Sequence, residues 1–340
     1  MLNLADNSTL IQAILVSFIS FVIVVFMMPR TISSLISKGK VVKDFHKPEL
    51  PLIPRPAGPT LLVGIATAEI ILFLLTFNVK VIAILLTTVI GFVIGLIDDK
   101  RVMPGSFKPL ALILAAVPLI VLGAYGSHLH LIFGAVFIPL LYVPLILVIV
   151  PIVGNTINSI DVLNGVASGF VIICTIPLLI SIAIFGSNDM FVAALPLLFG
   201  TLALYRFHKY PSKIFPGDSG TLLIGSMYGA IAIAGNSEVI GVISLLPAVM
   251  NSFLFLASVK KIVEHRQVKA RPTVLMDDYK LAASKEREAP TTLLRLILAR
   301  GPLSEKQIVG QVFKLGIFSS ILAVISIIIQ YYFVTGLIPK

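Results

Sequence analysis

The chain contains 340 residues, of which 57% are hydrophobic and only 12% are charged. A soluble domain carries about 25% charged residues, and so many apolar side chains exceed what one globular core can bury. The composition therefore predicts an integral membrane protein and excludes a soluble domain, a secreted disulfide scaffold and a disordered chain. Because Cys174 is the single cysteine, no internal disulfide can form.

Stretches without charged residues predict the membrane-spanning helices, because about 20 apolar residues cross a bilayer. The uncharged run 109–160 is long enough for two helices, and segment 58–77 is interrupted only by Glu69. We therefore expect an all-α integral membrane protein with ten transmembrane helices in a single polytopic domain, residues 1–340. The expected helices are 8–29, 58–77, 80–97, 109–124, 138–155, 166–186, 190–206, 219–235, 239–258 and 308–335.

The basic residues predict how these helices are oriented. The connections 30–57, 98–108, 206–218 and 259–307 contain 23 of the 26 Lys and Arg residues, and the intervening connections contain none. Since basic connections remain in the cytoplasm, we expect both termini outside. The formal net charge of +10 then reflects orientation. A nucleic-acid partner is not expected, since neither a separate basic domain nor interleaved aromatic and basic residues are visible.

The cytoplasmic connections are the polar part of the expected fold. Segment 31–47 predicts an interfacial helix followed by a polar turn, and the proline-rich segment 48–59 predicts a loop. The connection 259–307 is too long for a plain linker. We expect it to fold on the membrane surface as a cytoplasmic substrate-binding loop between helices 9 and 10. Its expected elements are strands at 262–265 and 273–276 and a helix at 291–299.

Two acidic clusters lie where expected helices meet the cytoplasm. Asp98 and Asp99 end an uncharged helix. Neighbouring carboxylates at a membrane boundary repel each other, and a bound cation or a proton would relieve that cost. Asp218 lies in Gly-Asp-Ser-Gly before another apolar helix, where free N–H groups and an acidic cap can organise a metal-phosphate site. The alternatives are a helix-end charge pair and a helix N-cap.

Amide side chains accompany these acids. The expected helix end at 155–165 contains Asn155, Asn158, Asp161 and Asn164. Continued helix would place the first three roughly on one face, and such oxygens are the ligands that Mg²⁺ prefers. The alternative is a polar helix cap and turn.

Basic residues are expected on the same membrane face as these acids and amides. Lys108, Lys269 and Arg271, with His265 and Arg266 nearby, suit a doubly charged diphosphate, although each alone is equally typical of a charge facing lipid headgroups. Acids, amides and bases on one membrane face together predict a metal-dependent site for a phosphorylated substrate.

The motifs resemble, in this order, those of the polyprenyl-phosphate N-acetylhexosamine-1-phosphate transferases, glycosyltransferase family 4. GLIDD (95–99) is similar to the family's acidic motif, NTINSIDVLNG (155–165) to its Asn-rich loop and IFPGDSG (214–220) to its Phe-x-Gly-Asp motif. The stretches 204–218 and 293–306 favour the dolichyl-phosphate GlcNAc-1-phosphotransferase branch over the bacterial cell-wall branch.

This resemblance implies that HexNAc-1-phosphate, with GlcNAc as the expected sugar, passes from a UDP-sugar to dolichyl or polyprenyl phosphate with release of UMP. The reaction would start lipid-linked oligosaccharide synthesis, as in N-glycosylation, from a site that faces the cytoplasm of a multi-pass membrane protein. The implied cofactor is Mg²⁺, with Mn²⁺ as a substitute. The implied partners are UDP-GlcNAc or a related UDP-HexNAc, the lipid phosphate and membrane lipids, and a homodimer is a possible assembly.

The resemblance also implies roles for residues of this chain. Asp98, Asp99 and Lys108 would act in catalysis, and Asn158 and Asp218 would hold the metal ion. The implied substrate-binding residues are Asp44, Phe45, Asn155, Asn164, Phe215, Lys269 and Arg271.

Within that scheme, Phe45 and Phe215 pack on uracil and Asn164 hydrogen-bonds to it. Three roles stay open for Asp98 and Asp99, namely base, nucleophile or positioning group. We prefer direct attack by the lipid phosphate. Arg55 departs from the pattern, since it stands where the eukaryotic dolichol enzyme, aligned on these motifs, carries an acid.

A secondary transporter is the rival interpretation. It would use Asp98, Asp99 and Glu69 for ion coupling, but it should carry polar groups at the bilayer midplane and a route to both sides. Most acids and amides of this chain instead gather at one expected membrane face.

Overall fold

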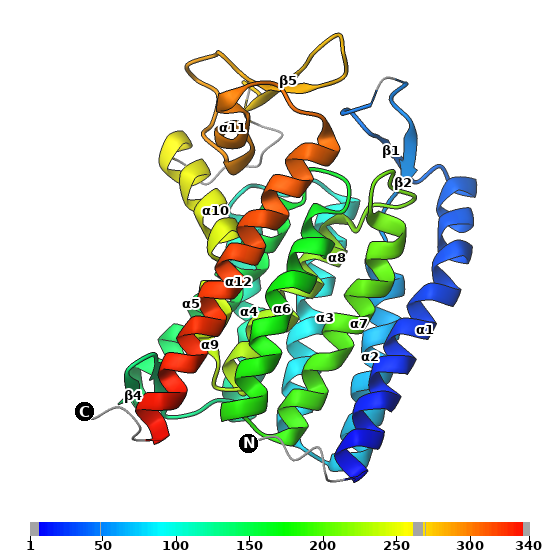
Figure 1. Ribbon diagram of the computed structural model, residues 1–340. Coiled ribbons are helices and arrows are strands. Elements are labelled where there is room, and N and C mark those ends of the chain that lie inside the picture. Colours follow the sequence, from blue (N-terminus) through cyan, green and yellow to red (C-terminus); the bar gives the residue numbers. More distant parts are fainter. Residues whose placement is uncertain (1–6, 48, 261–267, 269, 336–340) are drawn as a thin grey trace.

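The computed structural model describes residues 7–47, 49–260, 268 and 270–335. It is a bundle of helices with short antiparallel hairpins in the connections (Figure 1). The helices are α1 (Asn7–Ser37), α2 (Gly58–Thr76), α3 (Val79–Lys100), α4 (Phe107–Val121), α5 (Pro139–Ile160), α6 (Val166–Phe185), α7 (Asn188–His208), α8 (Gly217–Ala234), α9 (Glu238–Ser244), α10 (Leu246–Val259), α11 (Leu293–Ile297), the short 3-10 helix η2 (Leu298–Arg300) and α12 (Glu305–Thr335). The paired strands are β1 (Val41–Lys43) with β2 (Leu52–Pro54), β3 (His128–Leu131) with β4 (Gly134–Phe137), and β5 (Thr273–Leu275) with β6 (Leu281–Ala283).

Every expected span overlaps a helix, and the ninth overlaps two. Among the described residues, seven helices are long and apolar enough to cross a membrane, or eight if α9 and α10 form one bent span. Helix α4 is a shorter apolar helix, and α8 begins with the polar residues of the Gly-Asp-Ser-Gly motif. The structure therefore agrees with a helical membrane protein, while ten crossings stay a prediction.

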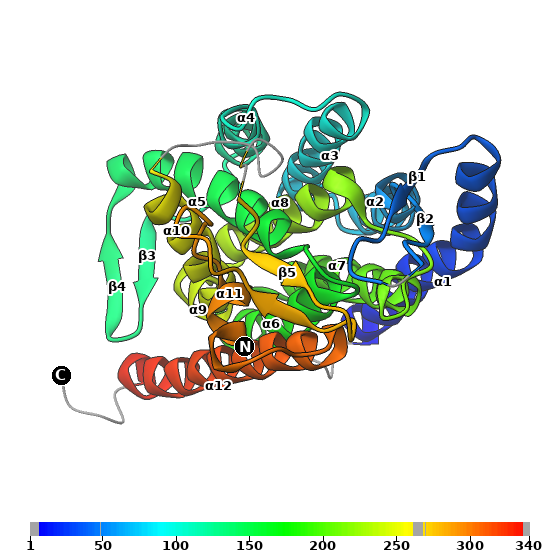
Figure 2. The same ribbon diagram turned by 90° about the horizontal axis from the view of Figure 1, so that it is seen from above.

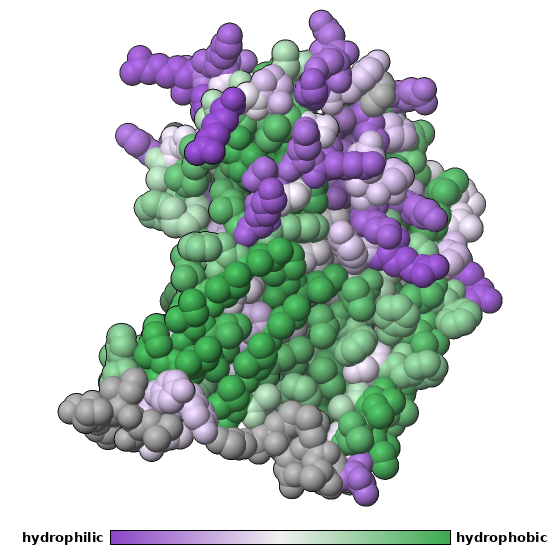
Figure 3. All heavy atoms as spheres, in the orientation of Figure 1, coloured by the Kyte–Doolittle hydropathy of each residue, from purple (hydrophilic) through white to green (hydrophobic). Residues whose placement is uncertain are grey.

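The two ends of the bundle differ in polarity. Hydrophilic side chains gather at the end that carries β1, β2 and β5, and hydrophobic side chains cover the body of the face shown (Figure 3). The first turn of α1 and the last turn of α12 both lie at the opposite end (Figure 1). An even number of crossings produces this arrangement. Which side of the membrane each end faces stays a prediction.

The ninth expected helix, 239–258, is broken. Helices α9 and α10 meet at Leu245 with a bend of 71°. Pro247 lies in the first turn of α10, and proline has no N–H with which to continue the hydrogen-bonded ladder of the preceding helix. The uncharged composition predicted the length of this segment but not its change of direction.

Two segments of the connection between α1 and α2 differ from the sequence prediction. Helix α1 continues to Ser37, so the first part of 31–47 extends the first helix and does not form a separate interfacial one. In segment 48–59, expected as a loop, Leu52–Pro54 pairs antiparallel with Val41–Lys43. Pairing between short strands depends on which backbones meet in the fold, and the local sequence did not reveal it.

Two of the elements expected in the connection 259–307 are present in its described part. The strand expected at 273–276 is β5, which pairs with β6, and the helix expected at 291–299 is α11 followed by η2. The strand expected at 262–265 lies outside the described residues. That this connection binds substrate stays a prediction.

Helix α8 lies inside the bundle (Figure 2), and all of its residues are buried. Small residues let α3 approach it closely. A Cβ built on Gly91 would lie 2.2 Å from Ser226 Oγ, and one built on Gly95 would lie 2.3 Å from the Asp218 carbonyl oxygen. Close helix contacts in membranes depend on such small residues. This packing fixes the end of α3 against the start of α8.

We expect Gly95→Ala to separate α3 from α8, because the added methyl group has no space. Overpacking of this kind costs about 1–3 kcal/mol, so the thermal unfolding temperature of the purified protein should fall. Gly310→Ala on α12 is the matched control, since a Cβ there meets no atom within 4 Å and alanine favours a helix. Equal unfolding temperatures for the two variants would contradict the argument.

Candidate functional site

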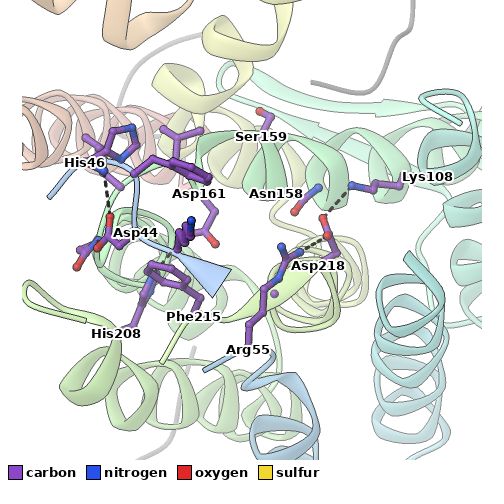
Figure 4. Close-up of a pocket in the computed structure, with 16 residues that line it drawn as sticks. Asp44, His46, Arg55, Lys108, Asn158, Ser159, Asp161, His208, Phe215 and Asp218 are labelled. Carbon is purple, nitrogen blue, oxygen red and sulfur yellow. Dashed lines mark hydrogen bonds and ion pairs between the residues drawn. The ribbon is translucent and has the colours of Figure 1, made fainter. Parts of the chain in front are cut away.

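A cavity of about 300 Å³ lies where β1 meets the ends of α5 and α7 and the starts of α4 and α8 (Figure 4). This volume is at the lower end of the range of small-ligand sites, about 300–1,000 Å³. The lining residues combine acids, bases, amides and two phenylalanine rings from segments far apart in the sequence. They are Lys43, Asp44, Phe45, His46, Arg55, Lys108, Asn158, Ser159, Asp161, Val162, Leu163, Asn164, His208, Phe215, Gly217 and Asp218.

Asp99, in the last turn of α3, caps the first turn of α8. Its Oδ1 accepts a hydrogen bond from the Asp218 N–H and its Oδ2 accepts one from the Ser219 N–H, each at 2.9 Å. A carboxylate in this position satisfies free N–H groups and faces the positive end of the helix dipole. A Cβ on Gly217 would meet the Asp99 carboxylate at 2.8 Å. The close approach therefore requires glycine at that position.

Lys108, at the start of α4, bridges two carboxylates. Its Nζ lies 3.0 Å from Asp98 Oδ2 and 2.8 Å from Asp218 Oδ1. Asp98 Oδ1 also accepts a hydrogen bond from the Met103 N–H at 3.0 Å. Since Asp98, Lys108 and Asp218 are all buried, removing one partner would leave an uncompensated charge. The charges of these three side chains therefore compensate one another.

Arg55 reaches these acids from the proline-rich segment that follows β2. Its Nη2 lies 2.9 Å from Asp99 Oδ1 and also donates to Asp218 Oδ2 (Figure 4). The backbone fixes this approach, because the Phe215 N–H donates to the Pro54 carbonyl at 3.0 Å. The Arg55 side chain is 23% exposed, whereas that of Asp99 is 4% exposed and that of Asp218 is 8% exposed. The Arg55 side chain is therefore more exposed than either acid that it contacts.

The donor chemistry of this wall fits a divalent cation. Asp218 supplies carboxylate oxygens, and Asn158 supplies an amide oxygen that also accepts a hydrogen bond from Thr221 Oγ1 at 2.7 Å. No group of three or more His, Cys, Asp or Glu side chains in the described part of the chain is placed to hold an ion. Mg²⁺ bound together with a phosphate needs only one or two carboxylates, because phosphate and water complete its shell.

The charges around Asp218 also favour a bound cation. Burial raises the pKa of Asp161 to about 7, against the opposing effect of the nearby Arg55 charge. Around Asp218, carboxylates outnumber the cationic groups paired with them, so a phosphate placed there would be repelled unless a cation accompanied it. The acids are Asp98, Asp99, Asp161 and Asp218, and the cationic side chains are Arg55 and Lys108.

Asn164 joins four segments at another part of the cavity. Its Oδ1 accepts hydrogen bonds from Lys47 Nζ at 2.7 Å and from the Ser212 N–H at 2.8 Å. Its Nδ2 donates to Asp44 Oδ2 at 3.1 Å, and its backbone N–H donates to Glu305 Oε1 at 2.8 Å. Burial acts to raise the pKa of Asp44, but hydrogen bonds from Lys47 and Asn164 outweigh it and hold the pKa below its ordinary value. This network connects the segment after β1 to the start of α12.

Two histidines of the cavity wall were not singled out from the sequence. His208 Nε2 lies 3.6 Å from Asp161 Oδ1, and His208 Nδ1 lies 2.9 Å from Ser168 Oγ. His46 follows β1, and burial lowers its pKa. The only sequence signal for His208 is its place within the stretch 204–218, which carries the family resemblance.

The structure brings most of the predicted site residues to one cavity. Asp98 and Asp99 lie behind its wall, paired with lining residues. Asn155 is half-buried on α5 and Arg271 is exposed, and neither belongs to the described lining; Lys269 lies outside the described residues. The predicted residues that do line the cavity are Asp44, Phe45, Lys108, Asn158, Asn164, Phe215 and Asp218.

The bundle and its cavity define a class of protein, a multi-pass membrane protein with a charged site at one end of its helices. Residues 81–236 match the family model described as glycosyl transferase family 4. A protein of Saccharolobus solfataricus is 30% identical over 93% of this chain and 95% of its own length. Its name, a provisional one, is UDP-N-acetylglucosamine–dolichyl-phosphate N-acetylglucosaminephosphotransferase.

Two further relatives agree with this match. A protein of Sulfolobus acidocaldarius with the same provisional name is 25% identical over 93% of this chain and 97% of its own length. A phospho-N-acetylmuramoyl-pentapeptide-transferase of Staphylococcus carnosus is 28% identical over 55% of this chain and 63% of its own length. The chain belongs to glycosyl transferase family 4, and the resemblance found in its motifs is confirmed, including the dolichyl-phosphate branch.

We expect Asn164→Ala to destabilise the protein, because it leaves the buried Ser212 N–H and the Asp44 carboxylate without this partner. Each buried polar group that loses its hydrogen bond costs about 1–3 kcal/mol. The thermal unfolding temperature should therefore fall. Asn155→Ala, at the half-buried position on α5, is the control and should change it less. A larger fall for the control would contradict the role given to Asn164.

Proposed function

We propose that the protein transfers HexNAc-1-phosphate, with GlcNAc as the expected sugar, from a UDP-sugar to dolichyl or polyprenyl phosphate. The products are polyprenyl-diphosphate-HexNAc and UMP, and the reaction starts lipid-linked oligosaccharide synthesis, as in N-glycosylation. The names of the relatives support this proposal. The observation that carries it is the Asp218 carboxylate, which faces the cavity between two cationic side chains at the end of an apolar bundle.

The proposed metal ligands are Asp218 and Asn158. When bound there, Mg²⁺, or Mn²⁺ in its place, would supply positive charge for the diphosphate of the donor. Lys108 lies against Asp218, so it both orients that carboxylate and adds a positive charge near the transferring phosphoryl group.

The proposed donor site extends from this wall toward β1. Phe45 is 62% exposed and Phe215 lines the cavity, so both rings are available to pack on uracil. The Asn164 amide nitrogen carries two hydrogens, of which Asp44 accepts one, and the other can bond to a uracil carbonyl. Lys269 and Arg271 are the proposed contacts for the sugar phosphate.

Asp98 and Asp99 act by positioning in this proposal. Asp99 holds the start of α8, and Asp98 holds Lys108. An oxygen of the lipid phosphate, already anionic at neutral pH, attacks the phosphorus that carries the sugar. The bond between that phosphorus and the bridging oxygen breaks, and UMP leaves with the electron pair. A strong general base is therefore unnecessary, and catalysis depends on alignment and charge.

The proposed site faces the cytoplasm. The polar end of the bundle contains the connections in which most Lys and Arg residues lie, and basic segments remain on the cytoplasmic side. The soluble donor then enters from the cytoplasm while the acceptor stays in the membrane. A homodimer remains a proposal for the assembly.

The test supplies purified protein with labelled UDP-GlcNAc, UDP-GalNAc or UDP-MurNAc-pentapeptide, each with dolichyl or undecaprenyl phosphate. We expect release of UMP from UDP-GlcNAc with a lipid phosphate, and loss of that release when EDTA removes divalent cations. No UMP from any pair would exclude the proposed reaction.

The same assay tests the metal site through a pair of variants. Asp218→Asn should lower the rate more than about 100-fold, because it removes a charged ligand and breaks the Lys108 pair. Asp278→Asn, at an exposed carboxylate near the β5–β6 turn, should leave the rate unchanged. Full activity of Asp218→Asn would remove this residue from the proposed site.

A further inference from the structure

A single nitrogen atom occupies the point on which two carboxylates of different helices converge. Arg55 Nη2 lies 2.9 Å from Asp99 Oδ1, at the end of α3, and also donates to Asp218 Oδ2, at the start of α8. Oxygens from separate carboxylates that meet at one point provide the geometry that binds a cation. The guanidinium of Arg55 therefore lies where a cation held by Asp218 would compete with it.

Arg55 is not what holds these helices together. Asp99 accepts both N–H groups at the start of α8 without it, and Lys108 pairs with Asp218 independently. Its side chain is also more exposed than either acid it contacts. Once its ion pair with a carboxylate is broken, a planar guanidinium is well suited to bind a phosphate through two parallel hydrogen bonds.

We propose that Arg55 competes with the divalent cation for Asp218 and moves to the donor diphosphate when the cation binds. The inference rests on the proposed function. Without donor, the cation must break the ion pairs of Arg55, and this cost weakens cation binding. When donor is present, its phosphates give the displaced Arg55 side chain a new partner. Cation and nucleotide sugar therefore bind cooperatively, and each tightens the other by the same factor.

The competition explains the position of Arg55 beside an acid-rich wall that must accept an anion. While paired, Arg55 reduces the repulsion among Asp99, Asp218 and the neighbouring Asp161. Once a divalent cation takes over that task, the single charge of Arg55 is released toward the substrate. The total positive charge near the diphosphate then rises in the state that reacts.

The test measures Mg²⁺ binding by titration calorimetry on the full-length protein in lipid nanodiscs, without donor and with UDP-GlcNAc. The lipid phosphate acceptor is omitted so that no turnover occurs. For Arg55→Gln we expect Mg²⁺ alone to bind about tenfold more tightly than to the unaltered protein, a change within the usual range of coupling between ligands. At saturating Mg²⁺, UDP-GlcNAc should bind this variant more weakly, and the coupling factor should fall.

Arg30→Gln is the matched control, since Arg30 is exposed on α1 and its loss changes the net charge equally. Both affinities should stay unchanged in this variant. Arg55→Lys keeps the charge without the planar fork, so Mg²⁺ binding should stay near that of the unaltered protein while UDP-GlcNAc binds more weakly. This variant also keeps the proposal testable if Arg55→Gln does not fold.

A purely structural role predicts a different result. If Arg55 only braced the cluster, Arg55→Gln would bind both Mg²⁺ and UDP-GlcNAc more weakly. Equal or weaker Mg²⁺ binding by a folded Arg55→Gln variant would overturn the competition while leaving UMP release by the unaltered protein intact. Failure of the proposed function would appear separately, as no UMP release from any donor and acceptor pair.

Discussion

The contact between the end of α3 and the start of α8 is the constraint on which the site depends. Gly95 lets the two backbones approach, and the Asp99 carboxylate accepts the first N–H groups of α8 in place of water. This contact fixes Asp218 beside other acids, where repulsion must be offset by cationic groups. Lys108 and Arg55 are bound there for that reason. The charge pattern is thus a consequence of helix packing.

The rest of the cavity wall follows a different principle. Around Asn164, hydrogen bonds connect the segment after β1 with the α5–α6 and α7–α8 connections and with the start of α12. Buried hydrogen-bond networks rigidify the segments that they join, so this one fixes the shape of the wall. The ion pairs around Asp218 are instead the part of the wall that, in our proposal, exchanges partners with an incoming cation or phosphate.

The sequence predicted the parts of this molecule that depend on local composition. Uncharged stretches located the helices, and short motifs located Asp98, Asp99, Asn158 and Asp218 at their ends. It did not predict the partner of each side chain, because Asp99 meets the Asp218 N–H only after distant helices have packed. The bend at Pro247 and the β1–β2 pairing were missed for related reasons, since several outcomes are compatible with the same local residues.

The position of the acids relative to the membrane separates the proposed transferase from an ion-coupled transporter. A transporter requires polar groups near the bilayer midplane and access from both sides. Glu69, midway along α2, is fully buried, and both of its carboxylate oxygens have no hydrogen-bond partner among the described residues. The acids that form ion pairs, in contrast to Glu69, lie at the polar end of the bundle. A reaction between a soluble nucleotide sugar and a lipid phosphate needs charge only where water and membrane meet, because both reacting phosphates lie at that boundary. Concentrating the ion pairs there also avoids the cost of burying them within the bilayer.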